Sequence, residues 1–321
     1  MMEELLAEAG LTLKQLDARY AKCESGLVVI GDTAARIAHR FQMPCRDVLA
    51  KGCWPANDPA GRQIIATMLS AVLPEPDFKG QLCGVTLPAG IEPLQAVKSR
   101  ARQRRDPGDA ERIMQLVRLH GYEPVFLPAG LAVVLAESAD SGFTGLGIDF
   151  GSGATNFSLA RQGVEIARCS IPLGSRWIDE RAARACAHYG WDPKGHRFSD
   201  LEAIGQWKLS LEGTLAAPAN PREHVLAALY TDMLEEVLNE GGRTLASHAE
   251  IDGILEPVSL VYAGGPTLIP GFSNLLESVL TGVSLPVKVD DIRGTRCPWT
   301  IARGALVYAE LERRTLELHA A

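Results

Sequence analysis

The sequence lacks the cysteine patterns that indicate a disulfide-rich or zinc-binding protein. Seven cysteines are scattered over 321 residues. They form no Cys-x-x-Cys pair and no His/Cys cluster at zinc spacing, so we expect no structural zinc site. An odd, scattered set of cysteines in a chain of this size indicates free thiols in a reducing cytoplasm.

The chain also lacks long apolar segments and an excess of positive charge. It has no run of about eighteen apolar residues and no basic-then-apolar segment at its start, so it predicts neither a membrane span nor a secretion signal. A net charge of −7 argues against general nucleic-acid binding. We therefore expect a cytoplasmic protein with no nucleic-acid partner, and we leave association with a membrane surface open.

Two segments are candidate surfaces for protein partners or an anionic membrane. The basic run Lys98-Ser-Arg-Ala-Arg-Gln-Arg-Arg105 stands out against the acidic background, although a solvated helix face also explains such a run. Residues 1–23 place leucines at helical spacing and predict one or two short amphipathic helices. Core packing explains this second pattern equally well.

Strand-like and helix-like segments alternate along the chain, which is typical of an α/β layer protein with a mostly parallel sheet. We expect strands at 26–30, 81–87, 123–127, 145–149, 155–161, 164–171, 258–262 and 286–290. We expect helices at 32–40, 64–72, 92–104, 109–120, 129–138, 174–188, 201–211, 221–245, 271–280 and 300–316, and a connecting loop at 41–62.

The stretch Gly145-Leu-Gly-Ile-Asp149-Phe-Gly151-Ser-Gly153-Ala-Thr155-Asn156 predicts a hairpin with a polar tip. Glycines permit a tight turn and let backbone amides approach an anion, so phosphate is a natural ligand. Asp149 would end a buried strand, where a carboxylate is costly unless it faces a cavity, a metal or hydrogen-bond donors. A purely structural hairpin remains the alternative.

A second glycine turn follows the apolar strand at 258–262, in the sequence Ala263-Gly264-Gly265-Pro266-Thr267. In an open α/β sheet, ligands bind beyond the carboxyl ends of the strands, where both glycine turns would lie. The two turns therefore predict the two sides of one nucleotide cleft. A diglycine turn that serves packing alone remains the alternative.

Taken in order, these motifs resemble the actin-like ATPase superfamily, and they are most similar to the bacterial actin homologue MreB. Residues 145–156 resemble its second phosphate loop, and residues 260–271 resemble its adenosine motif. The segment 170–180, with Asp179 on a helix, and the strand-to-helix passage 26–35 also look like parts of this family. The resemblance extends over most of residues 26–310.

The resemblance implies a two-lobed, actin-like (ribonuclease H-like) α/β fold with mixed, mostly parallel central sheets. The first lobe would span residues 1–143. The second would span residues 144–321 and carry a helical insertion at about 199–247.

The sequence departs from the family pattern in three places. Nothing in residues 1–30 supplies the first phosphate loop, of the type Asp-x-Gly-Thr. Leu127 stands where the family has the glutamate that positions the attacking water, a loss that costs about a hundredfold or more in rate. Gly205 or Gln206 stands where an acid near the ribose is expected, shortly before Lys208.

The resemblance implies ATP and Mg²⁺ as cofactors, bound weakly or lost, with Asp149 nearest the metal. The implied nucleotide-binding residues are Asp149, Gly151, Ser152, Gly153, Thr155, Asn156, Asp179, Lys208, Gly264, Gly265, Pro266 and Thr267. Two of these have simpler explanations, because a lone Lys208 usually faces solvent and Asp179 in a first helical turn suits the helix dipole. No catalytic residue is assigned.

The implied function is that of a bacterial MreB-like protein in cytoskeletal or cell-shape assembly, acting through filaments or partner contacts. One alternative is an active ATPase or phosphotransferase of the same superfamily. Another is a nucleotide-free scaffold of a pilus or secretion-type assembly.

Overall fold

The structure is a computed structural model that describes residues 10, 13–15, 18, 20–23, 26–40, 59–86, 109–191, 194–248, 251, 254 and 256–320. Four segments lie outside these residues: most of residues 1–19, all of residues 41–58, the predicted helix at 92–104 and the basic run at 98–105. The predictions made for those segments therefore stay predictions.

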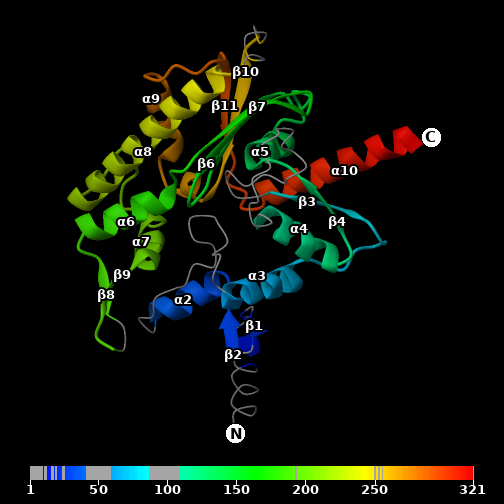
Figure 1. The fold of residues 1–321 in the computed structure, drawn as a ribbon. Helices are drawn as coiled ribbons and strands as arrows, with labels where there is room; N and C mark the ends of the chain where they lie inside the picture. Colours follow the sequence, from blue (N-terminus) through cyan, green and yellow to red (C-terminus); the bar gives the residue numbers. More distant parts are fainter. Residues whose placement is uncertain are drawn as a thin grey trace, which may run out of the picture.

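A five-stranded mixed sheet forms the centre of the molecule, with strand order β11-β10-β5-β6-β7 (Figure 1). Strands β11, β10 and β5 are parallel, whereas β5, β6 and β7 form an antiparallel meander. The strand bounds are β5 Gly145–Phe150, β6 Thr155–Arg161, β7 Val164–Ile171, β10 Val258–Ala263 and β11 Val289–Gly294.

Helices cover both faces of this sheet. Successive side chains of a strand point to opposite faces, and apolar side chains occur on both faces of this sheet, so both faces need to be shielded from water. Helices α5 (Ala129–Glu137) and α10 (Thr300–Ala320) pack on one face and form a core with Val261 and Ala263 of β10. A Cβ on Gly147 of β5 would lie 2.2 Å from the carbonyl oxygen of Gly130, so α5 approaches the sheet at backbone distance.

The larger core lies on the other face, where Leu146 and Ile148 of β5 point. Four helices cover this face and add side chains to its core: α6 Ser175–Ala185, α7 Leu201–Lys208, α8 Pro221–Ala246 and α9 Phe272–Leu280. Asn220 begins α8 by accepting a hydrogen bond from the Glu223 amide at 3.1 Å, and Pro221 occupies the first turn, where no amide donor is needed.

A smaller layer holds the remaining elements before the central hairpin. Strands β3 and β4 are parallel and share a core with the adjacent helices through Val85, Ala110, Val117 and Tyr122. The bounds are β1 Tyr20–Cys23, β2 Gly26–Val29, α2 Asp32–Arg40, α3 Pro59–Val72, β3 Leu82–Val85, α4 Asp109–Leu119 and β4 Glu123–Phe126.

Most predicted elements are confirmed, and four predictions were wrong in part. Residues 20–23 form the strand β1, paired antiparallel with β2, rather than a helix. Helix α3 begins at Pro59, inside the predicted loop, and the last strand lies at 289–294 rather than 286–290. The helix predicted to reach 188 ends at Ala185, and the short hairpin β8 (Tyr189–Trp191) and β9 (Arg197–Ser199) follows it.

The chain does not pass simply from one lobe to the next. Helix α10, at the end of the chain, packs against α5 and β3, both of which precede residue 144 (Figure 1). The division into lobes at 143/144 stays a prediction. Among the described residues, no helix is long and apolar enough to cross a membrane.

Candidate functional site

The register of the central sheet brings the two glycine turns together. Strand β10 lies beside β5 in parallel, and Ala263 is the partner of Asp149. The next residue, Gly264, has φ of +119°, and a Cβ there would lie 2.0 Å from the carbonyl oxygen of Phe150. Only glycine fits at this position. The turn after β10 is therefore packed directly against the end of β5.

Asp149 ends a chain of hydrogen bonds that crosses three strands at the same level. The side-chain amide of Asn156 donates to Asp149 Oδ2 at 3.0 Å, and the Ser170 hydroxyl donates to Asn156 Oδ1 at 2.7 Å. Burial raises the pKa of Asp149 from 3.8 to about 6, and the Asn156 hydrogen bond opposes this rise only in part. Ser170 was not predicted; the register of β5, β6 and β7 is the signal that would have found it.

At the hairpin tip, two backbone carbonyls accept hydrogen bonds from α6, whereas two backbone amides donate none within the described residues. Within the described residues, the backbone N–H groups of Ser152 and Gly153 donate no hydrogen bond, and the Ser152 side chain is exposed. The carbonyls of Gly151 and Ser152 accept hydrogen bonds at 3.1 and 2.9 Å from the amides of Ser175 and Arg176, the first residues of α6. The tip is thus fixed to the start of α6 while two of its donors remain available.

Thr155 has a role inside the fold. Its side chain is fully buried, and its hydroxyl donates to the Leu173 carbonyl at 2.8 Å, which joins the start of β6 to the segment after β7. The hydroxyl proton is therefore committed to the backbone.

Asp179 and Lys208 form a buried ion pair between α6 and α7. The Lys208 side chain is only 6% exposed, so the simple expectation that it faces solvent was wrong. Burial raises the pKa of Asp179, and the Lys208 charge opposes that rise. The Lys208 ammonium also lies 5.9 Å from the ring centroid of Tyr230 on α8. The two predicted residues thus contact each other.

The diglycine turn continues into the short 3₁₀ helix η2 (Gly265–Leu268), in which Pro266 and Thr267 are buried. The Thr267 hydroxyl donates to the Gly264 carbonyl at 2.8 Å and closes the turn. Gly265, by contrast, is exposed, and a Cβ there would meet no atom within 4 Å. Packing explains Gly264 but gives no reason for a glycine at 265.

Single carboxylates, rather than clusters, characterise this site. Among the described residues, no three His, Cys, Asp or Glu side chains are grouped as a metal site would require. Asp149 alone fits Mg²⁺ as a hard oxygen ligand, and Mg²⁺ commonly takes one or two carboxylates and completes its shell with water and substrate phosphate. The residues therefore fit a metal that arrives with a nucleotide.

The sequence itself identifies the family. Residues 5–309 match the sequence model of a family described as Volactin. The chain belongs to the Volactin family. No curated protein matches the sequence.

Several solved structures share the fold of this Volactin-family chain at low sequence identity. MreB 5 of Spiroplasma citri bound to AMPPNP is 14% identical over 94% of this chain and 90% of its own, with a TM-score of 0.61. The MamK double helical filament is 16% identical over 94% and 88%, with a TM-score of 0.59. Ethanolamine utilization protein EutJ from Carboxydothermus hydrogenoformans is 15% identical over 83% and 79%, with a TM-score of 0.51.

These structural matches confirm the predicted actin-like α/β fold. They leave two finer predictions for the Volactin-family chain as they were: that MreB is its nearest relative, and that the first phosphate loop is missing. The second departure has a structural context, because Leu127 is fully buried in the core formed with α5. A side chain there contacts the core and not a solvent-filled site.

Proposed function

We propose that this chain is an actin-fold assembly protein that binds an adenine nucleotide weakly at the paired glycine turns. It acts through filament formation or partner contacts, in an MreB-like cytoskeletal or morphogenetic role, more than through nucleotide turnover. The observation that carries the proposal is the position of Gly264 against Phe150, which supports a single site formed by the two turns at the carboxyl ends of adjacent strands.

Three features of the site favour an anionic ligand with a metal. The Ser152 and Gly153 amides are available donors, and backbone amides in such a turn bind phosphate well. Gly265 leaves open space where a ligand can approach the backbone. Asp149 carries a buried carboxylate whose ionised form would be stabilised by a cation.

The names of the structural neighbours support the same function. The MreB 5 structure holds AMPPNP, and the MamK structure is a double helical filament. At 14% and 16% identity these neighbours share the fold, so nucleotide binding and assembly are proposals for this chain.

Two features argue that binding is weak and turnover poor. Lys208 is already neutralised by Asp179, so contact with a nucleotide would require this buried pair to open. Leu127 supplies no carboxylate to accept a proton from water. If bound, Mg²⁺ would neutralise phosphate charge beside Asp149. Asp149 would then be a metal or water ligand, and the tip amides would orient the phosphates.

Isothermal titration of magnesium-ATP tests the nucleotide proposal. We expect measurable binding to the wild type, at least tenfold weaker binding to Asp149→Ala, and unchanged binding to Asp290→Ala, which alters an exposed aspartate on β11. Sedimentation with and without ATP tests the switch. Absence of heat in the wild type would refute nucleotide binding, and assembly that ignores ATP would refute the switch.

A nucleotide-free scaffold is the second candidate, favoured by the internal contacts of the site. Asn156 and Ser170 already hold Asp149, and the tip carbonyls already bind α6, so the hairpin is ordered without a ligand. ATP-independent assembly without detectable binding would support this candidate. Phosphate release that disappears in Asp149→Ala would instead support an active ATPase or phosphotransferase.

A further inference from the structure

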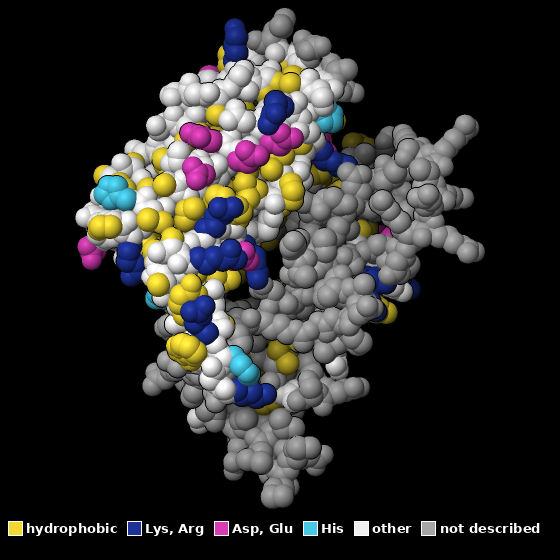
Figure 2. All heavy atoms as spheres, turned by 60° about the vertical axis from the view of Figure 1, so that its left-hand side comes forward, with side chains coloured by type: hydrophobic (Ala, Val, Ile, Leu, Met, Phe, Trp, Pro, Cys, Tyr) yellow, Lys and Arg dark blue, Asp and Glu magenta, His cyan; other side chains and the backbone are white. Residues whose placement is uncertain are grey.

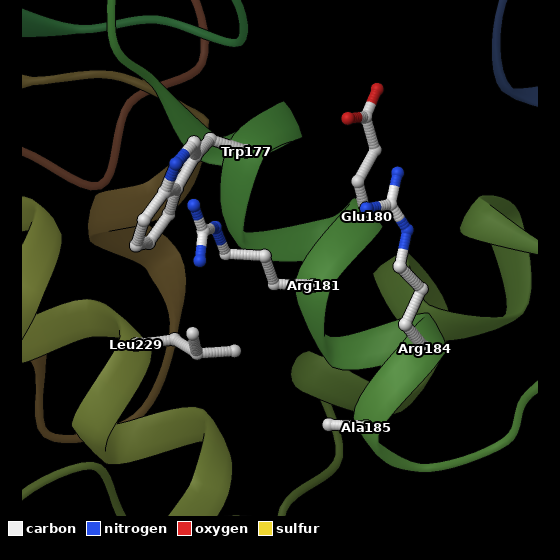
Figure 3. A pocket seen from close by; sticks show the side chains of 6 residues that line it. All are labelled: Trp177, Glu180, Arg181, Arg184, Ala185 and Leu229. Atoms are coloured by element: carbon white, nitrogen blue, oxygen red, sulfur yellow. The ribbon is translucent and has the colours of Figure 1, made fainter.

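An open groove lies between α6 and α8, on the side of these helices that faces away from the sheet. The cavity in it has a volume of about 640 Å³ and is lined by Trp177, Glu180, Arg181, Arg184, Ala185 and Leu229 (Figure 3). The Arg181 guanidinium stacks 4.1 Å from the Trp177 ring centroid, which holds that charge at the groove. None of the predicted nucleotide-site residues lines this cavity.

The two helices place opposite charges on either side of the groove. Exposed Arg181 and Arg184 project from α6, one helical turn apart. On α8, exposed Asp232, Glu235 and Glu236 follow Leu229 at helical spacing. Within the described residues, none of these five side chains forms an ion pair.

The face as a whole carries both signs of charge. Figure 2 shows a group of Asp and Glu side chains on its upper part and Lys and Arg side chains both above and below them, with hydrophobic side chains between. An acidic partner would match the α6 arginines but would be repelled by the α8 carboxylates, and a basic partner would have the opposite problem. A partner that matches both must carry the two charges side by side.

We propose that this face binds a second copy of the chain, with α6 of each copy lying over α8 of the other. Such a twofold contact is self-complementary, because the arginines of each copy meet the carboxylates of its partner. Trp177 and Leu229 lie in the middle of the contact, where apolar anchors contribute most to affinity.

The dimensions of the face suit a small contact. Helix α8 has 26 residues and is therefore about 39 Å long at a rise of 1.5 Å per residue. Helix α6 has 11 residues and is about 17 Å long, so the two helices, each about 10 Å wide, present roughly 560 Å², which is the size of a small, weak contact. The contact goes beyond the proposed function, because it needs no nucleotide.

Sedimentation velocity without nucleotide tests the contact. We expect the wild type to dimerise. The variant Arg181→Glu/Arg184→Glu should dimerise about a hundredfold more weakly, because it places like charges opposite each other. The control Arg161→Glu/Arg296→Glu makes the same charge change at exposed positions outside the groove and should dimerise like the wild type.

A second variant makes the test specific for a twofold contact. Asp232→Lys/Glu235→Lys/Glu236→Lys should also lose dimerisation. Its equimolar mixture with Arg181→Glu/Arg184→Glu should regain affinity to within about tenfold of the wild type, because each α6 then meets an α8 of opposite charge. Thermal melting confirms that each variant is folded.

The outcomes also separate this contact from the nucleotide proposal. A wild type that stays monomeric, or folded variants that do not associate on mixing, would overturn the second-copy contact and leave the face to a different protein. Neither result bears on magnesium-ATP titration, which reads the glycine turns alone. Failure to bind ATP would leave the dimer measurements unaffected.

Discussion

Replacing Asp149 by Asn should stabilise the ligand-free chain at neutral and alkaline pH. Burial raises the pKa of this carboxyl from 3.8 to about 6, so above pH 6 the folded chain carries an ionised group that would be better solvated in the unfolded chain. The cost is about 3 kcal/mol at pH 8, because one pKa unit corresponds to 1.36 kcal/mol. Asparagine removes the charge and can still accept the hydrogen bond from Asn156.

The gain in the free energy of unfolding from Asp149→Asn should be larger at high pH than at low pH. Because the pKa is raised in the folded state, the cost is complete above pH 6 and disappears as the pH falls toward 3.8. The gain from Asp149→Asn should therefore fall from about 3 kcal/mol at pH 8 to about 1.5 kcal/mol at pH 5. Urea denaturation of both proteins at the two pH values measures this difference, since all other titrating groups are common to them.

A control and a ligand arm make the measurement decisive. Asp290→Asn, at an exposed position, should change the free energy of unfolding by less than about 0.5 kcal/mol. If the site holds Mg²⁺ with a nucleotide, magnesium-ATP should stabilise the wild type and not Asp149→Asn. A variant that is less stable than the wild type, or one whose gain is the same at both pH values, would refute the account of a desolvated Asp149.

The other predictions concern single contacts, and chemical denaturation measures each. Gly264→Ala should cost more than about 2 kcal/mol because of its positive φ and its contact with a backbone carbonyl, whereas Gly265→Ala should change stability by less than about 0.5 kcal/mol and still weaken magnesium-ATP binding. Lys208→Met should cost about 3 kcal/mol because it leaves the Asp179 carboxylate buried and unpaired, and Lys208→Met/Asp179→Leu should recover most of that loss. Glu223→Gln should lower the urea midpoint at pH 7, because hydrogen bonds from backbone amides, that of Ala219 first, lower the pKa of this carboxyl; the difference should shrink as the pH falls through that pKa.

The sequence predicted the elements with strong local patterns. The hairpin of β5 and β6 was correct because its glycine tip and its alternating residues are local signals. The long helix α8 was correct because Asn220 and Pro221 mark its start and the apolar spacing continues to Leu245. Strand β1 and the hairpin β8–β9 were missed because strands of three or four residues have too few positions to show a period.

The sequence predicted the order of the site's motifs along the chain but not the contacts between their side chains. The adjacency of Asp149 and Gly264 follows from the pairing of β10 with β5, which the sheet register shows. Ser170 and the pairing of Lys208 with Asp179 depend on residues 14 and 29 positions apart, and no local pattern encodes such contacts. For Lys208 the sequence indicated a nucleotide contact, with solvent exposure as the simpler alternative because lysine is rarely buried without a partner, and here the partner lies on another helix.

The contrast between Gly264 and Gly265 shows what the structure adds to a motif. Both glycines belong to the same diglycine pattern, and the sequence offered packing and ligand approach as alternatives for the pair. The structure separates the alternatives by residue: a Cβ at 264 would meet the backbone of β5, and a Cβ at 265 would meet no protein atom within 4 Å. Fold stability therefore accounts for the first glycine, whereas no protein contact accounts for the second. Substitution of Gly265 therefore tests the proposed ligand contact with little expected effect on the fold.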